Sequence, residues 1–321
     1  MRRLSAACLL LMLAGCCDLP QTPPGFDAFV RELKREALAS GIREETLDQA
    51  FNGVYFIERA VSKDRSQPEI KLTLDTYLEQ RLSWLKVQRG RAVLADSHQQ
   101  LEPIAARYGV PPAVVVGLWG LESSYGRNVG RYPLISSLTT LAFEGRRGDF
   151  FRKELMAALR ILEQGHITPE RMTASWAGAM GQAQFMPTSF EHYAADGDGD
   201  GHKDIWTNKT DVFASIANYL KENGWRPGMP WGVEVVLPKD FDAALLGRDQ
   251  RRSVAQWQQL GVAALSDPLP DAELTTRLVA PDGQHGRVFL VTRNYNAFLA
   301  WNRSDYFALA IGLFTDQLSE P

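Results

Sequence analysis

The chain has 321 residues, of which 45% are apolar and 23% are charged, and its formal net charge is −3. This length allows one large core or two domains. The small net charge, with no long basic run, argues against nucleic acid as a partner. All three cysteines (Cys8, Cys16 and Cys17) lie near the N-terminus, so the rest of the chain has no disulfide framework, cysteine metal site or cysteine nucleophile.

The N-terminus has the layout of an export signal. Arg2 and Arg3 precede an apolar stretch, Leu4–Leu13, that is too short to be a permanent membrane span. The tetrapeptide ending at Cys16 resembles the bacterial lipobox, which implies a signal peptide over 1–15, lipidation of Cys16 and a tether over 16–25. The alternative is an ordinary signal peptide with an incidental cysteine. We therefore expect a lipoprotein anchored to a membrane in the periplasm of a Gram-negative bacterium, with the outer membrane favoured.

The next part of the chain is expected to be mostly helical. Apolar residues recur at helical spacing in several segments, and a helix over 151–164 is expected to stop at Gly165. Asp211 is expected to cap a further helix that ends at Gly224. The periodic residues are Phe26, Phe29, Val30, Leu33 and Ala37, then Leu74, Tyr77, Leu78, Leu82 and Leu85, and later Val212, Phe213, Ile216, Ala217 and Leu220.

The pattern changes after Gly224, where proline and glycine are dense. Short β-like runs follow at 233–237, 276–280 and 288–292, with a turn signal at 281–283 between the last two. Helical spacing returns from Tyr306 to Leu313. The fold class is therefore mainly α (α+β), with a helical N-terminal region (26–110), a helical core (111–224), a small β-containing subdomain (225–295) and a C-terminal helix (296–317) that returns to the core.

Glu122 is the one charged side chain in a long apolar run that begins at Val114. Pro111 and Pro112 open this run, and Gly126 follows at a place where a helix would stop. A carboxyl group at the end of a mostly buried helix is poorly solvated, so its pKa should be raised, as a general acid near neutral pH requires. The alternative is a surface glutamate that closes an apolar helix.

A second motif, Ser175–Pro187, is rich in small residues and glycine, which let the backbone approach a ligand or another element. Gln182 and Gln184 offer amide groups suited to sugar hydroxyl and acetamido groups. The motif does not match a phosphate-binding pattern.

Together, the segments 117–126 and 177–187 resemble the lytic murein transglycosylase B family, and the resemblance extends over about 25–317. It implies a lysozyme-like helical core and cleavage of the β-1,4 bond between N-acetylmuramic acid and N-acetylglucosamine, which leaves a 1,6-anhydromuramoyl end. The acid/base glutamate of the family falls on Glu122. The Ser175–Pro187 motif holds no acidic residue to act as the second carboxylate of a two-carboxylate glycosidase, and no catalytic cofactor is implied.

The resemblance also assigns substrate-binding residues. An arginine pair is expected to bind a peptide or lactyl carboxylate. An asparagine is expected to contact the sugar; it follows Trp301, and the family often has tyrosine in place of this tryptophan. The alternatives are core positions for the aromatic residues and solvated charges for the arginines. The residues assigned are Ser175, Gln184, Tyr77, Tyr219, Arg146, Arg147 and Asn302.

An acidic loop over 196–211 resembles the front half of a calcium-binding EF-hand. Its aspartates stand at positions 1, 3, 5 and 9 with glycine at 6, whereas position 12 is Thr207 rather than Glu. A longer loop that closes on Asp211 resembles the variant EF-hand of the family, and a structural calcium ion is expected. The alternative is a solvated Asp-Gly turn. The proposed ligands are Asp196, Asp198, Asp200, Asp211 and the backbone carbonyl of His202.

Three other functions compete with a transglycosylase. They are a hydrolysing muramidase, a non-catalytic peptidoglycan-binding lipoprotein on the same fold, and a calcium sensor, for which a single loop is weak support. The expected partners are peptidoglycan glycan strands and, through the lipid anchor, a membrane. Enzymes of cell-wall synthesis or division are also considered as partners, but the sequence identifies none.

Overall fold

The structure is a computed structural model that describes residues 22–66 and 72–320. It is mainly helical with small antiparallel sheets, in agreement with the predicted α+β class. The predicted signal peptide and the proposed lipidation site, Cys16, lie outside the described residues.

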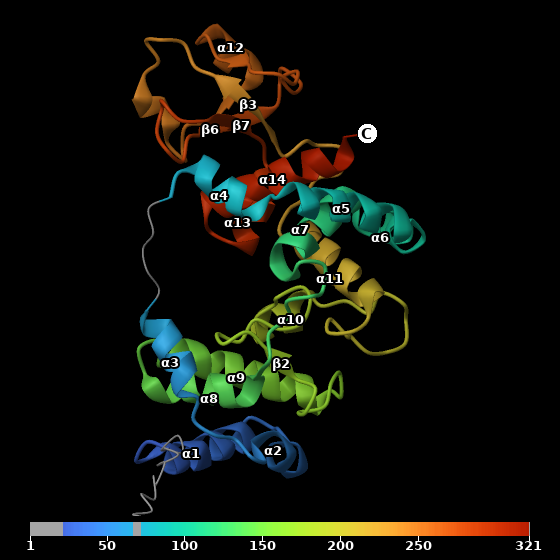
Figure 1. The fold of residues 1–321 in the computed structure, drawn as a ribbon, viewed down its shortest axis with the longest axis vertical. Helices are drawn as coiled ribbons and strands as arrows, with labels where there is room; N and C mark the ends of the chain where they lie inside the picture. The colour runs from blue at the N-terminus through green and yellow to red at the C-terminus, as the bar shows by residue number, and fades with distance from the viewer. Residues whose placement is uncertain (1–21, 67–71, 321) are drawn as a thin grey trace, which may run out of the picture.

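One half of the helical body is built from the N-terminal helices and the middle of the chain (Figure 1). The first three helices pack on α8 and α9, and α10 joins α9 to the rest of the body. α1 buries Phe26, Leu33 and Ala37, as the spacing predicts. These helices are α1 (Phe26–Ala39), α2 (Glu44–Phe51), α3 (Glu58–Arg65), α8 (Leu134–Glu144), α9 (Gly148–Glu163) and α10 (Pro187–Tyr193).

The other half surrounds a single apolar helix, α7, which is buried over nearly its whole length. Helices α5, α6, α11 and α14 pack against α7, so the C-terminal helix returns to the body (Figure 1). The helices of this half are α4 (Leu74–Arg81), α5 (Trp84–Asp96), α6 (His98–Tyr108), α7 (Pro112–Ser123), α11 (Lys209–Glu222), α13 (Asn294–Trp301) and α14 (Asp305–Ser319).

A five-stranded antiparallel sheet forms the small subdomain at one end of the molecule (Figure 1). Its strand order is β4-β6-β7-β3-β5, and it encloses its own core around the fully buried Trp257. The three longer strands correspond to the three predicted β-like runs. The elements are β3 (Gly232–Val236), η1 (Ala243–Leu246), β4 (Arg252–Ser253), α12 (Val254–Gln259), β5 (Ala263–Ala264), β6 (Thr275–Val279) and β7 (Val288–Val291).

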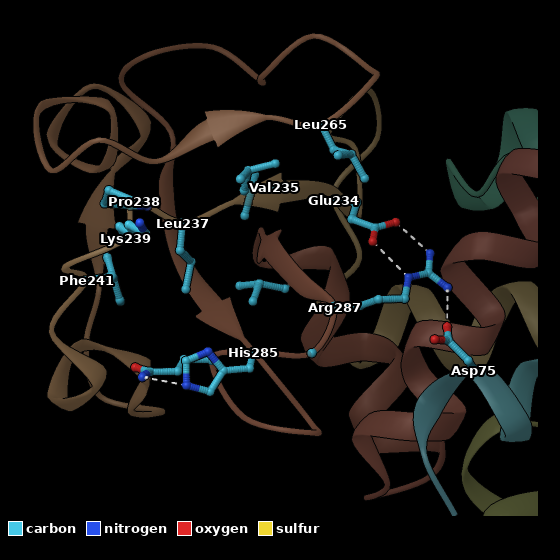
Figure 2. A pocket seen from close by; sticks show the side chains of 14 residues that line it. Asp75, Glu234, Val235, Leu237, Pro238, Lys239, Phe241, Leu265, His285 and Arg287 are labelled. Atoms are coloured by element: carbon cyan, nitrogen blue, oxygen red, sulfur yellow. Dashed lines mark hydrogen bonds and ion pairs between the residues drawn. The ribbon is translucent and has the colours of Figure 1, made fainter.

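The sheet subdomain is attached to α4 by charged and polar contacts. Arg287 donates to Glu234 at 2.8 and 2.6 Å and lies 3.4 Å from a carboxylate oxygen of Asp75 (Figure 2). Asp282, in the predicted turn, accepts from the backbone N–H of Leu74 at 2.7 Å and from the hydroxyl of Tyr306. A hollow of about 730 Å³ beside Arg287 includes none of the predicted substrate-binding residues.

Three local predictions are wrong. The periodic segment 74–85 is two helices, because Ser83 accepts from Lys86 N and caps a new helix, and Leu85 is 72% exposed. The expected helix over 296–317 is also two helices, because the hydroxyl of Ser304 caps α14. The cap of α11 is Asn208 rather than Asp211, which is buried inside the first turn.

Among residues 22–66 and 72–320, no single helix is both long and apolar enough to cross a membrane. Helices α6 and α7 together have the length and apolar character of a span, but they are bent by 110° at the break between them.

Candidate active site

The end of α7 places Glu122 in the site. Proline at the first helical position starts this helix, and three consecutive left-handed residues end it: Ser124, Tyr125 and Gly126, with φ of 51°, 62° and 79°. The ring of Tyr125 folds back onto the helix at Gly120. A Cβ atom at that position would lie only 2.7 Å from the ring, so glycine is required there. The helix therefore ends at Ser123, three residues before Gly126, and Tyr125 packs against its last turn.

Glu122 is partly shielded from solvent and has one hydrogen-bond donor. The indole Nε1–H of Trp301 donates to Glu122 Oε1 at 2.7 Å. Burial raises the pKa of Glu122 to about 7, although the bond from Trp301 and the positive charge of Arg81 both act in the opposite direction. The direction agrees with the expectation from the sequence, and a pKa of about 7 leaves the group partly protonated at neutral pH.

A cluster of aromatic rings holds Trp301 in place. The centroid of its ring lies 5.3 Å from that of Phe185 and 4.6 Å from that of Tyr219, and Tyr193 lies 4.4 Å from Tyr219. The hydroxyl of Tyr219 donates to the carbonyl oxygen of Ala300 at 2.7 Å. Tyr219 is buried and its hydroxyl is engaged inside the protein, so the structure gives it a supporting contact to Trp301.

Helix α4 forms another wall of the site. Burial raises the pKa of Tyr77, and the charge of Glu122 adds to this rise, which places the two groups within electrostatic reach of each other. The ring of Tyr77 meets that of Tyr306 edge-on at 5.7 Å, and the guanidinium of Arg81 lies 5.5 Å from the centroid of the Tyr77 ring. Tyr77 and Arg81 thus stand one helical turn apart on α4, and the charge of Glu122 is coupled to both groups.

The Ser175–Pro187 motif is a pair of tight turns that follow β2 (Thr173–Ala174), which pairs with β1 (Tyr132–Pro133). The hydroxyl of Ser175 accepts from the N–H of Ala179 at 3.1 Å. Gln184 adopts φ of 50° and donates from Nε2 to the carbonyl of Gly181 at 2.8 Å. Both side chains are half-buried and keep polar atoms free to bind a ligand.

Gln182 and two glycines join this motif to the end of α7. The amide oxygen of Gln182 accepts from Trp119 Nε1 at 3.0 Å, and its nitrogen donates to the carbonyl of Trp206 at 2.8 Å. A Cβ on Gly126 would lie 2.4 Å from the same amide oxygen, and one on Gly130 would lie 2.1 Å from the carbonyl oxygen of Ala174. Gln182 is therefore a buried structural residue, and the two sequence motifs form one unit.

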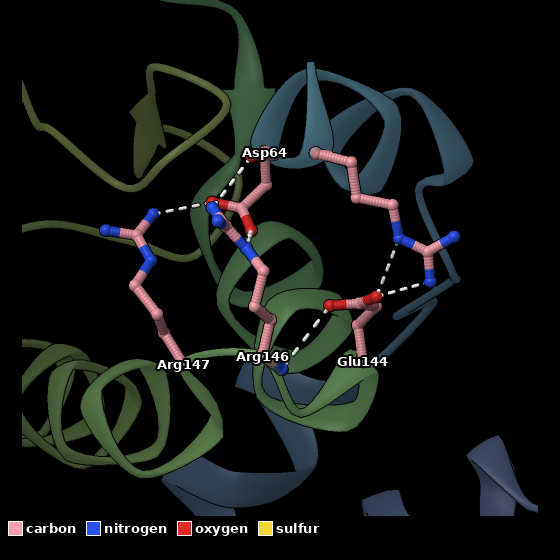
Figure 3. A network of polar contacts seen from close by, with 5 residues as sticks. Asp64, Glu144, Arg146 and Arg147 are labelled. Carbon is pink, nitrogen blue, oxygen red and sulfur yellow. Dashed lines mark hydrogen bonds and ion pairs between the residues drawn. The ribbon is translucent and has the colours of Figure 1, made fainter. Parts of the chain in front are cut away.

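Arg146 and Arg147 meet a buried aspartate (Figure 3). Arg146 Nε donates to Asp64 Oδ2 at 2.7 Å, and Arg147 donates to Oδ1 at 2.6 Å. Hydrogen bonds from Arg146 and Arg147 hold the pKa of Asp64 below its usual value. The arginine side chains are 50% and 42% exposed, whereas that of Asp64 is 2% exposed. The structure thus ties this pair to α3, and half of each side chain stays accessible.

Asn302 lies directly after α13 and is exposed. Its side-chain oxygen accepts from the N–H of Ser304 at 3.1 Å, which leaves its amide nitrogen available. The backbone places it next to Trp301, whereas the contacts of the predicted arginine pair are with Asp64 on α3.

The acidic loop gathers three carboxylates. Oxygens of Asp196, Asp198 and Asp211 lie within 4.8 Å of one another, as the longer-loop interpretation requires. Asp211 accepts from the N–H groups of Gly197 and Asp204 at 2.8 and 2.7 Å, and burial raises its pKa. The group does not include Asp200, whose carboxylate accepts from the N–H of His202 at 2.7 Å.

Two residues that act on Glu122, namely Trp301 and Arg81, were not predicted as site residues from the sequence. Trp301 was noted only for stacking, yet it is the hydrogen-bond donor to Glu122. Arg81, which acts on the charge of Glu122, stands four residues after Tyr77. That i, i+4 spacing on one helical face was the available signal for Arg81, whereas nothing local to Trp301 indicated its partner.

A carboxyl group whose pKa is raised by an apolar setting is the general acid of lysozyme-type glycan cleavage, although most glycosidases add a second carboxylate. The described contacts of Glu122 are an indole donor and a guanidinium charge and include no second carboxyl group. The chain belongs to the transglycosylase SLT-domain family, whose model matches residues 25–316. The family resemblance predicted from the two motifs is thereby confirmed.

Characterised relatives agree with this assignment. The chain is 32% identical over 210 residues to membrane-bound lytic murein transglycosylase B of Escherichia coli K12, a match that spans 64% of this chain and 56% of that protein. It resembles the structure of Pseudomonas aeruginosa SltB3 in complex with NAG-anhNAM-pentapeptide at a TM-score of 0.89 and 44% identity, covering 92% of this chain and 80% of the other.

A third relative is the E. coli lytic transglycosylase Slt35 in complex with calcium. The similarity has a TM-score of 0.75 and 26% identity, and it covers 92% of this chain and 93% of that one. The predicted lysozyme-like transglycosylase fold is confirmed by these structures.

Proposed function

We propose that the protein is a lytic transglycosylase that cleaves the β-1,4 bond between N-acetylmuramic acid and N-acetylglucosamine in peptidoglycan and leaves 1,6-anhydro ends. The observation that carries this proposal is Glu122, a partly shielded carboxyl group with a pKa of about 7 that is oriented by one indole N–H. Family membership and the peptidoglycan fragments bound by SltB3 support it.

One carboxyl group serves both halves of the reaction. Protonated Glu122 donates its proton to the glycosidic oxygen as the bond from that oxygen to C1 of the muramoyl residue breaks. The substrate's acetamido group supports the positive charge that develops at C1. The oxygen of the substrate's 6-hydroxyl then bonds to C1, and the carboxylate of Glu122 takes the proton of that hydroxyl. This step regenerates the acid and consumes no water.

Trp301 orients the acid in this mechanism. An indole N–H can donate a hydrogen bond but cannot accept one. Because the indole N–H of Trp301 already binds Oε1, the proton of neutral Glu122 must sit on Oε2 or point away from the indole. The same bond also stabilises the carboxylate that forms after the first proton transfer. Trp301 therefore positions the proton of Glu122 without exchanging one itself.

Other residues are proposed to bind the glycan strand. The candidates are Tyr77, whose pKa responds to the charge of Glu122, and Asn302, which follows Trp301. Ser175 and Gln184 offer polar atoms from the two tight turns. Tyr219 supports Trp301 from behind. Arg146 and Arg147 keep exposed N–H groups that suit a peptide or lactyl carboxylate, and Asp64 holds them in place.

Product chemistry tests the reaction. When purified sacculi are digested with the protein, mass spectrometry is expected to find muropeptides that end in 1,6-anhydromuramic acid. A hydrolysing muramidase would give reducing ends instead, heavier by one water. A protein that only binds the cell wall would release no fragments.

We also propose that the acidic loop binds a structural calcium ion. The oxygens of Asp196, Asp198 and Asp211 fit one ion, because calcium–oxygen distances place opposite ligands roughly 5 Å apart. Three carboxylates this close repel one another without a cation. Asp200 and the carbonyl of His202 remain proposed ligands, and the calcium complex of Slt35 supports the assignment.

Chelation tests the calcium proposal. Adding EGTA is expected to lower the melting temperature by a few degrees, because an ion at about 100 times its Kd stabilises a fold by about 2.7 kcal/mol. The Asp198→Asn variant, which alters an exposed ligand, should melt at the same temperature with and without EGTA. Identical melting curves of the parent protein with calcium and with EGTA would contradict the site.

A lipid anchor is proposed at Cys16, outside the described residues. It would hold the enzyme at the periplasmic face of a membrane, the outer one being favoured, within reach of the wall. The membrane-bound E. coli relative supports this location. Fractionation of cells that express a Cys16→Ala variant tests it, since continued membrane association would refute the anchor.

A further inference from the structure

A small surface at the start of α5 combines apolar and cationic side chains. We call it the rim patch and define it as Trp84, Leu85, Lys86, Arg89 and Arg127. Trp84 is 70% exposed and Leu85 is 72% exposed, more than any other large hydrophobic side chain in the described residues. Exposed apolar side chains that gather beside polar ones mark interaction sites.

The cations of the rim patch have no protein counter-charge. Leu85, Lys86, Arg89 and Arg127 line a hollow of about 160 Å³ together with Ser124 and Tyr125, and no acidic side chain lines it. None of the three cations takes part in an ion pair among the described residues. By contrast, Arg91 on the same helix lies 3.7 Å from a carboxylate oxygen of Glu320 and donates to the carbonyl of Gln317 at 3.0 and 2.7 Å.

The rim patch adjoins the catalytic carboxyl group. Ser124 and Arg127 belong to the turn that directly follows Glu122 on α7. The hydroxyl of Tyr125 donates to the carbonyl of Lys86 at 2.8 Å and so fixes this turn to α5. On α4, Arg81 acts on the charge of Glu122 and stands three residues before Trp84. The patch therefore begins where the site around Glu122 ends.

We propose that the rim patch binds peptidoglycan beyond the cleaved bond. The exposed indole of Trp84 would stack on a sugar ring, and Lys86, Arg89 and Arg127 would bind the carboxylates of the stem peptides that the strand carries. A glycan strand that continues from Glu122 past Ser124 would meet these groups. This inference rests on the proposed function and extends it from the cleaved bond to the neighbouring repeat of the strand.

The test measures binding separately from cleavage. All variants are made in the full chain with Glu122→Gln, and their affinity is measured for intact sacculi and for sacculi from which an amidase has removed the stem peptides. The Arg89→Gln/Arg127→Gln double variant is expected to bind intact sacculi about tenfold more weakly, as two exposed charge pairs allow, and to bind stripped sacculi as the parent does. Trp84→Ala is expected to weaken binding to both.

Arg91→Gln is the matched control, because it removes one positive charge from the same helix outside the patch, and it should bind as the parent does. Melting curves show that each variant is folded. Unchanged binding of the double variant, or equal losses on intact and stripped sacculi, would overturn the proposal. The proposal would also be overturned if the double variant lost binding only to vesicles of phosphatidylglycerol, because the patch would then be a membrane contact. If wild-type protein released no anhydro products, the proposed function would fail separately.

Discussion

Glu122→Gln is expected to lower the turnover of purified sacculi by about 10³-fold or more. Glutamine keeps the shape of the side chain and can still accept the bond from Trp301 Nε1. It cannot donate an acidic proton to the leaving oxygen or take the proton of the 6-hydroxyl. Proton transfer by one positioned group contributes about 10²–10⁴-fold, and this variant loses both transfers.

The same substitution has a distinct expected effect on stability. The folded pKa of Glu122, about 7, lies above its ordinary value of 4.5, so the folded state binds the proton more tightly than the unfolded state. This preference stabilises the wild type fully at low pH, and the contribution is lost as pH rises through about 7. Glu122→Gln should therefore melt no lower than wild type at pH 8.

Glu79→Gln serves as the control, since Glu79 is exposed on α4, and it should retain normal activity. Near-normal turnover by Glu122→Gln in a folded protein would contradict the assignment. An inactive variant that melts far below wild type at every pH would instead point to a structural role for the carboxyl group.

Trp301→Phe is expected to shift the pH dependence of activity. Wild-type activity should decline as pH rises through about 7, because Glu122 must start protonated. Phenylalanine keeps a ring near Tyr219 and Phe185 but removes the N–H that lowers the pKa of Glu122. A hydrogen bond to a charged group is worth about 1.5–3 kcal/mol, so the decline should move up by about one to two pH units. The rate should also fall about tenfold on the low-pH plateau, because the acid is no longer oriented.

Trp301→Tyr is the conservative variant, because a phenol can also donate a hydrogen bond to the carboxylate. It should restore part of the wild-type pH profile, and it tests whether the bond or the bulk of the indole is responsible. If Phe and Tyr at this position gave the same pH profile and the same rate, Trp301 would be only a packing residue.

Local patterns in the sequence predicted much of this molecule. The apolar run before Glu122 indicated a buried helix and a poorly solvated carboxyl group, and both are present. Short β-like runs after Gly224 indicated the three longer strands of the sheet subdomain. These predictions succeeded because a helix or strand buried on all sides leaves a continuous apolar run in the sequence.

Contacts between distant segments were not predictable in this way. Trp301 meets Glu122 across 179 residues, and Arg146 meets Asp64 across 82. Asp211 looks like a helix cap because it lies near the start of α11, but its carboxylate turns inward to the acidic loop. The break between α4 and α5 was hidden because Ser83 caps a new helix while the apolar spacing continues past it.

The source of the oxygen in the product tests the central claim most directly. The proposed mechanism uses one carboxyl group twice and takes its nucleophile from the substrate. Sacculi digested in water enriched in heavy oxygen should therefore yield anhydromuropeptides that carry no label at the cleaved muramoyl C1. Reducing ends that carry one heavy oxygen at this carbon would mean that water attacks, and that Glu122 acts in a hydrolase.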